Sequence, residues 1–238
     1  MSKKITLGIF ASMGEGAVVL LSDDAVLSAL PIGPTGTHNS RLFPVIEDVL
    51  SANSLKLQEV SAVAADVGPG SFTGIRLALS AARTLGWIGN LRLIPVVSLD
   101  VLAIDASNKL AAKGLCPDVF AVGLDARKRS VYCAVYSMDK TVSRARSPFL
   151  LPIADVARLI PPDCVLCGQG FSEYDLSHWK GKVFADQLDY SPALCAQAVT
   201  RALRKGFFCD WKNLVPIYLR RAEAEEVWDR KFGGRSDS

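Results

Sequence analysis

Short apolar runs separated by glycine and aspartate clusters dominate the first third of the chain. They predict three strands, joined by turns at 14–16 and 22–24: Ile5–Ala11, Ala17–Leu21 and Ala25–Leu30. Apolar positions at helical spacing between 42 and 50 then predict a helix with Ser40 as its N-cap. A strand at Ser61–Val67, a helix at Phe72–Leu85 and a strand at Leu93–Val97 complete this half of the chain.

The second half of the chain repeats this order. Its apolar runs predict three strands, then a helix, a strand and a helix: Val119–Leu124, Ser130–Tyr136, Val142–Leu150, Ala154–Ile160, Cys164–Cys167 and Ala193–Arg204. Three antiparallel strands followed by alternating helix and strand, occurring twice, predict a duplicated α/β fold. That is the layout of the actin-like (ASKHA) class, built from two ribonuclease-H-like halves in two lobes. We expect lobes at 1–103 and 104–221, with a charged C-terminal tail at 222–238.

Charge and hydropathy narrow the function classes. The 238 residues carry 27 basic and 24 acidic side chains, a formal net charge of +3. A free-standing nucleic-acid binder usually has a clustered basic face, and the short clusters at 127–129 and 220–221 are more typical of solvated turns. The first apolar run, after two lysines, lacks the length and cleavage site of a signal peptide. With no apolar stretch long enough to span a bilayer, we expect a cytoplasmic protein that does not enter a membrane.

The cysteines and histidines do not form a recognisable site. Cys164 and Cys167 have the C-x-x-C spacing, but no second pair or neighbouring histidine completes a metal set. In a strand they would face opposite sides, as buried reduced thiols. His38 and His178 lie far apart, without the H-E-x-x-H motif, and we interpret each as a surface or capping residue. We therefore predict no metal site, and neither a metallopeptidase nor a Ser-His-Asp hydrolase.

The segment 68–74, Gly-Pro-Gly-Ser-Phe-Thr-Gly, leaves a strand and enters a helix. Its glycines permit a sharp turn and a close backbone approach, and the helix N-terminus favours an anion. It matches neither the P-loop nor the dinucleotide-binding pattern. Two interpretations stay open: a tightly packed strand–helix turn, capped by a loop hydroxyl, or an anion or nucleotide loop. The residues of such a loop would be Gly68, Gly70, Ser71 and Thr73.

The helix after this loop is apolar on more than one face. Small residues line one side, while leucine and isoleucine side chains spread around the rest: Gly74, Ala78, Ala81 and Ala82, with Ile75, Leu77, Leu79 and Leu85. Small side chains let a second helix approach closely. A helix that is apolar on several faces must be covered on several faces, by its own domain or by a partner.

The glycine-rich segment and four other stretches resemble the bacterial TsaB family, also called YeaZ. The match is collinear from about residue 5 to residue 221. The stretches are Gly68-Pro-Gly-Ser-Phe-Thr-Gly-Ile-Arg76, Ile94-Pro-Val-Val-Ser-Leu-Asp-Val-Leu102, His38-Asn-Ser-Arg-Leu-Phe-Pro44, Asp125-Ala-Arg127 with Val131-Tyr132, and Val215-Pro-Ile-Tyr-Leu-Arg220. The resemblance implies the actin-like two-lobed fold and a non-catalytic scaffold subunit. That subunit binds and activates TsaD, the transferase that makes N6-threonylcarbamoyladenosine beside the anticodon of certain tRNAs.

The same resemblance implies the partners and the surface. TsaD would form a heterodimer with this chain, the ATPase TsaE would join the pair, and tRNA would be contacted through the complex. Without TsaD, the chain would form a homodimer through the same surface. Helices over Ser40–Leu50 and Phe72–Leu85 would supply that surface. Its residues would be Leu42, Phe43, Ile46, Leu50, Gly74, Leu77, Ala78, Ala81 and Leu85.

Two differences from the sequences of related enzymes argue against catalysis by this chain. Ser98 and Leu102 stand where TsaD-type enzymes carry the histidines of a metal motif, and neither side chain replaces a histidine ligand. Phe10 stands where actin-like ATPases place a cleft aspartate, which argues against ATP as a cofactor. The alternative is an autonomous actin-fold ATPase or small-molecule kinase, which would need a cleft aspartate on the first strand and another on the hairpin of the second half. Asp125 could fill the second place, and Asp66 lies near the glycine loop. Asp125, after a strand, is more typical of a turn residue.

Overall fold

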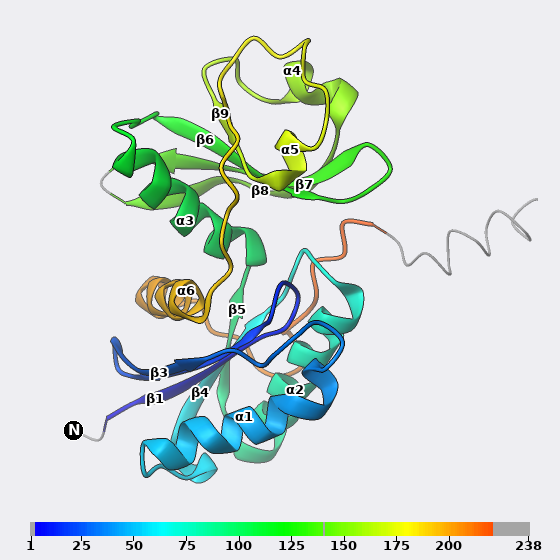
Figure 1. The fold of residues 1–238 in the computed structure, drawn as a ribbon. Coiled ribbons are helices and arrows are strands. Elements are labelled where there is room, and N and C mark those ends of the chain that lie inside the picture. Colours follow the sequence, from blue (N-terminus) through cyan, green and yellow to red (C-terminus); the bar gives the residue numbers. More distant parts are fainter. Residues whose placement is uncertain (1–2, 140, 221–238) are drawn as a thin grey trace, which may run out of the picture.

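Five strands form the first sheet of the computed structural model, which describes residues 3–139 and 141–220 (Figure 1). The strand order is β3-β2-β1-β4-β5. Its strands are β1 (Ile5–Phe10), β2 (Ala17–Ser22), β3 (Ala25–Leu30), β4 (Val60–Asp66) and β5 (Arg92–Val96). The first three strands are antiparallel and joined by short turns, whereas β4 and β5 run parallel to β1.

The second sheet has the same topology. Its order is β10-β9-β6-β7-β8, which in the reverse direction matches the first sheet strand for strand. Its strands are β6 (Val119–Asp125), β7 (Ser130–Met138), β8 (Val142–Pro152), β9 (Val165–Cys167) and β10 (Val183–Phe184). Strands β6 to β8 are antiparallel and β9 runs parallel to β6. The predicted duplicated, actin-like α/β fold is therefore confirmed.

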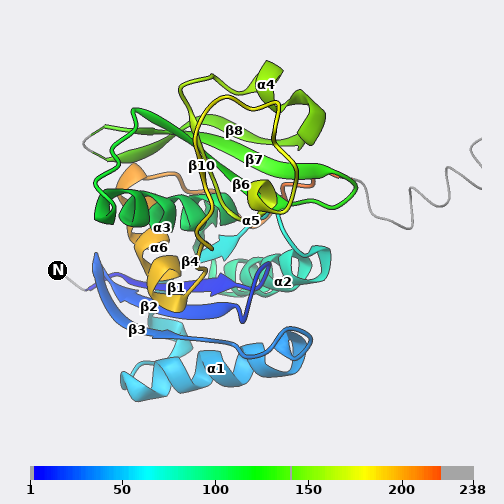
Figure 2. The same ribbon diagram turned by 45° about the horizontal axis from the view of Figure 1, so that its top comes forward.

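Helices cover both faces of each sheet. Helices α1 (His38–Ala52) and α2 (Phe72–Gly89) pack on one face of the first sheet. Helices α3 (Ser98–Ala112) and α6 (Pro192–Lys205) lie between the two sheets, as Figures 1 and 2 show. The short α4 (Val156–Leu159) and α5 (Gln169–Ser172) lie on the outer side of the second sheet, and 3-10 turns occupy Leu57–Glu59 and Ile153–Asp155. Within the described residues, no helix is both long and apolar enough to cross a membrane.

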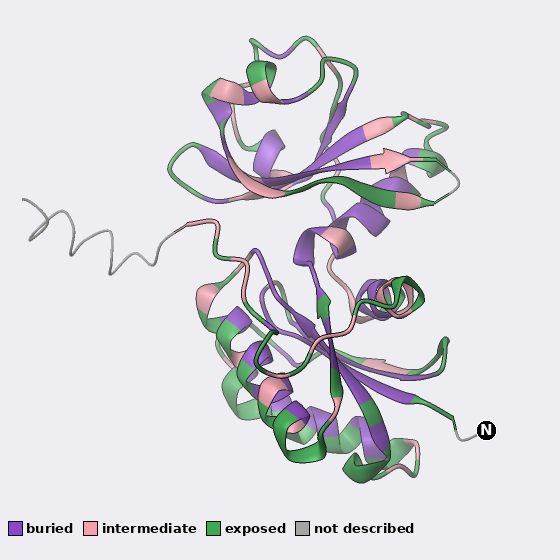
Figure 3. Ribbon diagram, turned by 180° about the vertical axis from the view of Figure 1, so that it is seen from behind, coloured by how far each residue is buried: buried purple, intermediate pink, exposed green. Residues whose placement is uncertain are grey.

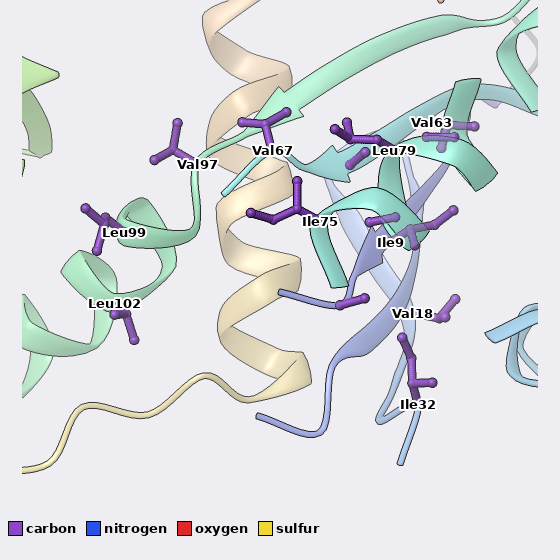
Figure 4. Close-up of a cluster of buried hydrophobic side chains, with 14 of the residues drawn as sticks. Ile9, Val18, Ile32, Val63, Val67, Ile75, Leu79, Val97, Leu99 and Leu102 are labelled. Carbon is purple, nitrogen blue, oxygen red and sulfur yellow. The ribbon is translucent and has the colours of Figure 1, made fainter. Parts of the chain in front are cut away.

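Alternation along β1 distributes its side chains between two cores. Leu7 and Ile9 join the core under α1 and α2, part of which Figure 4 draws, while Phe10 joins the core under α6. Because the first sheet is covered on both faces, β1 and β2 are buried along their whole length. That burial explains why their sequences are continuous apolar runs and not alternating ones.

The helices differ from the predictions at several points. Helix α1 begins at His38 with Thr37 at the N-cap position, so the N-cap prediction for Ser40 was wrong. Helix α2 continues to Gly89, four residues beyond the predicted end. Helix α3 was not predicted at all. Its residues from 98 to 107 are buried apart from Asp100, so it shows no polar face, and Figure 3 colours most of it as buried.

The expected lobe boundary at 103/104 falls inside α3, and α6 from the second half of the sequence packs on the first sheet. The two sheets are thus linked through two helices that contact each other, α6 on the first sheet and α3 on the second. The division into lobes at 1–103 and 104–221 stays a prediction. The charged tail at 222–238 lies outside the described residues.

Candidate partner-binding face and glycine loop

The glycine-rich loop packs its backbone directly against the end of β1. A Cβ atom added at Gly74 would lie 1.9 Å from the carbonyl oxygen of Ala11, and one at Gly70 would lie 2.8 Å from that of Ser12. The Ser71 amide donates a hydrogen bond to the Ser12 carbonyl oxygen at 2.9 Å. The Ser71 Oγ accepts from the Gly74 amide at 3.4 Å and caps α2. Close packing between two backbones therefore accounts for these glycines.

Asp66, the last residue of β4, is fully buried behind this loop. Its Oδ1 accepts hydrogen bonds from the Gly68 amide at 3.0 Å and the Ser98 hydroxyl at 2.6 Å. Its Oδ2 accepts from the Ser12 amide at 3.1 Å and the Tyr190 hydroxyl at 2.9 Å. Burial, followed by the neighbouring Asp66 charge, raises the pKa of Tyr190 well above its ordinary value. These four donors come from four separate chain segments, so the Asp66 carboxylate joins these segments through hydrogen bonds.

Replacing Asp66 with alanine is expected to destabilise the protein by about 3 kcal/mol or more, because the buried donors would lose their acceptor. Urea unfolding followed by circular dichroism measures the change. The matched control is Asp24→Ala, since Asp24 is exposed and pairs with Arg204 at 3.0 Å on the surface. The control should change the free energy of unfolding by less than about 1 kcal/mol. Equal effects of the two substitutions would contradict the structural role of Asp66.

The residues of the predicted anion loop divide into two groups. Ser71 and Thr73 line a hollow of about 640 Å³ whose other walls come from the β1–β2 turn and the start of α1. Gly68 and Gly70 instead pack against neighbouring chain, since a Cβ at Gly68 would lie 2.6 Å from the Ile75 side chain. Arg76 also lines the hollow. The structure accounts for the glycines by packing, and anion binding by Ser71 and Thr73 stays a prediction.

The positions that carry functional side chains in related enzymes have structural roles here. Phe10 is buried and meets the ring of Tyr190 edge-on at 6.3 Å between centroids. Ser98 hydrogen-bonds to Asp66, and Leu102 is buried in the core. Asp125 accepts hydrogen bonds from the Arg127 amide at 2.8 Å and the Tyr174 hydroxyl at 2.7 Å, the arrangement of a turn residue.

The histidine and cysteine predictions can be compared directly. His38 is buried, with its Nε2 3.0 Å from the Gly33 carbonyl oxygen, so its interpretation as a surface residue was wrong. Cys164 and Cys167 belong to different cores, which confirms that they face opposite sides of the sheet. Burial raises the pKa of each thiol to about 12. Across residues 3–139 and 141–220, no three His, Cys, Asp or Glu side chains are grouped to hold a metal.

The predicted partner surface separates into buried and exposed members. Of its nine residues, six are buried in the core of their own sheet: Leu42, Ile46, Leu50, Gly74, Ala78 and Ala81. Phe43 is 52% exposed, and Leu77 and Leu85 are half-buried. Helical periodicity identified the apolar positions correctly but did not distinguish those facing the sheet from those facing solvent.

The exposed apolar residues of this region surround a hollow between α1 and α2. The hollow measures about 420 Å³ and is lined by side chains that include Phe43, Leu57 and Leu85. Ile88, 74% exposed, follows Leu77 and Leu85 along the same side of α2. We name these five residues, Phe43, Leu57, Leu77, Leu85 and Ile88, the α1–α2 face. Sequence analysis missed Leu57, which lies in the 3-10 turn after α1, and Ile88, which lies beyond the predicted end of α2.

The C-terminal segment 207–220 covers another side of α2, and Figure 1 draws it in orange. The Arg83 Nε donates to the Trp211 carbonyl oxygen at 2.9 Å, and the Trp87 and Trp211 rings lie 6.4 Å apart. Nearer the N-terminus of α2, Phe72 meets Tyr218 at 4.8 Å between ring centroids. The chain thus covers two sides of this helix itself, the sheet side and the segment side. The α1–α2 face lies on a third side.

Residues 31–184 match the family model described as TsaD, a tRNA N6-adenosine threonylcarbamoyltransferase. The tRNA threonylcarbamoyladenosine biosynthesis protein TsaB of Bacillus subtilis is 28% identical over 89% of this chain and 92% of its own length. The protein of the same name from Escherichia coli is 32% identical over 52% of this chain and 51% of its own. A Pseudomonas aeruginosa structure described as similar to peptidase YEAZ superposes with a TM-score of 0.75, at 25% identity, covering 92% of this chain and all of that one.

Proposed function

The chain belongs to the TsaB (YeaZ) family, and from this premise we propose that it takes part in threonylcarbamoyladenosine biosynthesis in tRNA as the non-catalytic partner of TsaD. The name of its Bacillus subtilis relative, which it matches over nearly the whole length, supports a role in this process. The family model describes the transferase itself, which supports TsaD as a partner of closely similar fold.

The α1–α2 face is the observation that carries the proposal. Phe43 is 52% exposed and lines the hollow together with Leu57 and Leu85. Ile88 is 74% exposed and lies on the same side of α2 as Leu85. Large apolar side chains gathered around a hollow are typical of a protein-binding surface. A surface presented by two helices suits a partner that offers two equivalent helices, which TsaD would have if it shares the duplicated fold.

The network around Asp66 supports a role without catalysis. All four donors of the network come from this chain, so the carboxylate is already satisfied without a ligand. Phe10 fills the place at which an ATPase of this fold would present its first carboxylate. The alternative of an autonomous ATPase or kinase would then depend on Asp125, whose carboxylate is engaged in its own turn.

In the proposed assembly, the chain forms a heterodimer with TsaD through the α1–α2 face, and TsaE joins that pair. When TsaD is absent, two copies of the chain pair through the same face, because a C2 contact can reuse one surface on both subunits. Contact with tRNA is made through the complex.

Reconstitution of tRNA modification tests the proposal. The reaction is run with this chain alone, with TsaD alone and with both, each in the presence of TsaE, ATP, unmodified tRNA and the activated threonylcarbamoyl donor. Modified adenosine is measured by mass spectrometry of digested tRNA. We expect product only in the mixture that holds both proteins, because neither alone completes the assembly. Product with this chain alone would overturn its non-catalytic role.

A further inference from the structure

A pocket of about 120 Å³ lies between the two sheets, away from the glycine loop and the α1–α2 face. Its walls come from β5, α3, β7, β8 and α6, so residues from both sequence halves are required to form it. Its polar lining consists of five side chains: Asp100, Tyr136, Arg144, Arg201 and Lys205. Phe207, 71% exposed, stands among the residues that line it just after α6. Figure 2 shows α3 and α6 side by side beneath the second sheet.

The only carboxylate in this lining already has its partners. The Oδ1 atom of Asp100 accepts a hydrogen bond from the Tyr136 hydroxyl at 2.9 Å and lies 3.4 Å from the Nη1 of Arg144. Burial is the main cause of a raised pKa at Asp100, and Arg144 opposes it. One carboxylate therefore faces three cations, Arg144 from β8 and the pair Arg201 and Lys205 from α6. The lining carries an excess of positive charge.

Among the three cations of this lining, Arg201 is the one whose guanidinium has no acceptor in the described residues. Its side chain is half-buried, and burial lowers the pKa of its guanidinium. Within the described part of the chain, no hydrogen bond or ion pair is recorded for that guanidinium, although Asp100 is near enough to act on it electrostatically. A partly desolvated guanidinium usually has a planar acceptor. Lys205 lies one helical turn further along the same side of α6.

We propose that this inter-sheet pocket is a binding site for a phosphate group, held by Arg144, Arg201 and Lys205. A pocket of this volume has room for one phosphate group. Two guanidinium groups on different walls can each offer paired N–H donors to tetrahedral oxygens, which favours phosphate over chloride. This site is independent of the proposed pairing with TsaD, because the α1–α2 face lies on the other side of the first sheet.

Calorimetric titration of inorganic phosphate into the full chain, in a chloride buffer of constant ionic strength, tests the site. We expect saturable binding with a dissociation constant near or below about 1 mM. Arg201→Gln should weaken it by about tenfold or more, because a charge-assisted hydrogen bond is lost. The matched control is Arg204→Gln, three residues along the same helix, whose side chain is exposed and pairs with Asp24. The control should leave the affinity within about twofold, because that side chain lies outside the pocket.

Two further variants distinguish a loss of phosphate binding from a loss of folding. Lys205→Gln changes an exposed residue and should weaken phosphate binding several-fold without changing the unfolding transition. Asp100→Asn should strengthen binding, because it removes the negative charge that Asp100 presents to the anion. A residue needed only for folding would not give effects of opposite sign. Absence of saturable binding, or equal weakening by Arg201→Gln and Arg204→Gln, would overturn the site.

Two added ligands identify the source of the phosphate group. Adenosine monophosphate and a short single-stranded oligoribonucleotide are titrated under the same conditions into wild-type and Arg201→Gln protein. Tighter binding of the oligoribonucleotide, with competition by inorganic phosphate, assigns the pocket to an RNA backbone, with Phe207 placed to stack on a base. Equal affinity for all three assigns it to a free phosphate. Loss of binding in Arg201→Gln supports the site in either case, and unchanged binding of all three contradicts it.

Discussion

Gly74→Ala is expected to destabilise the protein by about 3 kcal/mol or more, because the added Cβ would overlap backbone atoms of the neighbouring segment. The added Cβ would lie 1.9 Å from the Ala11 carbonyl oxygen and 2.7 Å from the carbonyl carbon of the same residue. These are backbone atoms of the chain leaving β1, so they cannot rotate away as a side chain can. Relief requires α2 to move off the first sheet, which exposes part of the core. Urea unfolding measures the loss.

The control for this substitution is Gly89→Ala, at the last residue of the same helix. The nearest atoms to a Cβ there belong to the Leu91 side chain, at 2.9 Å, and that side chain is only half-buried. Alanine also has the higher helix propensity, by about 1 kcal/mol. Gly89→Ala should therefore leave the stability nearly unchanged. If Gly74→Ala were equally harmless, the close approach of the glycine loop to β1 would be incorrect.

Ile88→Arg is expected to weaken the association with TsaD by about 100-fold, or roughly 2–3 kcal/mol, because the guanidinium would be buried in an apolar interface without a partner. The side chain is 74% exposed in the isolated chain, so the substitution should leave the fold intact. Phe43→Arg tests the α1 side of the same face and should act in the same direction. Isothermal titration with TsaD measures both affinities.

A matched control for the charge itself is Val26→Arg. Val26 lies on the edge strand β3 and is 49% exposed, close to the value of Phe43, but it is outside the α1–α2 face. The control should bind TsaD as the wild type does. Equal losses from Val26→Arg and Ile88→Arg would show that added charge, and not the location of the residue, weakens the complex.

Local patterns predicted much of the fold from the sequence. The strands and the helix after the glycine loop are marked by runs of apolar residues between turn residues, and the duplicated order of elements follows from them. Helix α3 was missed because its residues from Ser98 to Ser107 are buried on nearly all sides between two sheets. A helix without a polar face has no amphipathic period to detect. Its position depends on the packing of both halves, which no local window contains.

The candidate site was predictable only in part. The helices of the α1–α2 face were identified, yet the strongest apolar periodicity marks the residues that face the sheet, such as Leu42 and Ala78. The exposed Leu57 and Ile88 lie outside that periodicity. The hydrogen-bond network around Asp66 was not predictable, since its donors are separated from Asp66 by up to 124 positions in the sequence. Hydrogen bonds across such separations are set by tertiary structure alone.

Sedimentation velocity of this chain, alone and mixed with an equal amount of TsaD, tests whether the α1–α2 face is the pairing surface. We expect the isolated chain to form a dimer and added TsaD to replace it with a heterodimer of one copy each, because both contacts use the α1–α2 face. Ile88→Arg should yield monomers in both samples. Separate sedimentation of the wild-type chain and TsaD, or a complex in which the dimer of this chain persists, would show that the α1–α2 face does not serve both contacts.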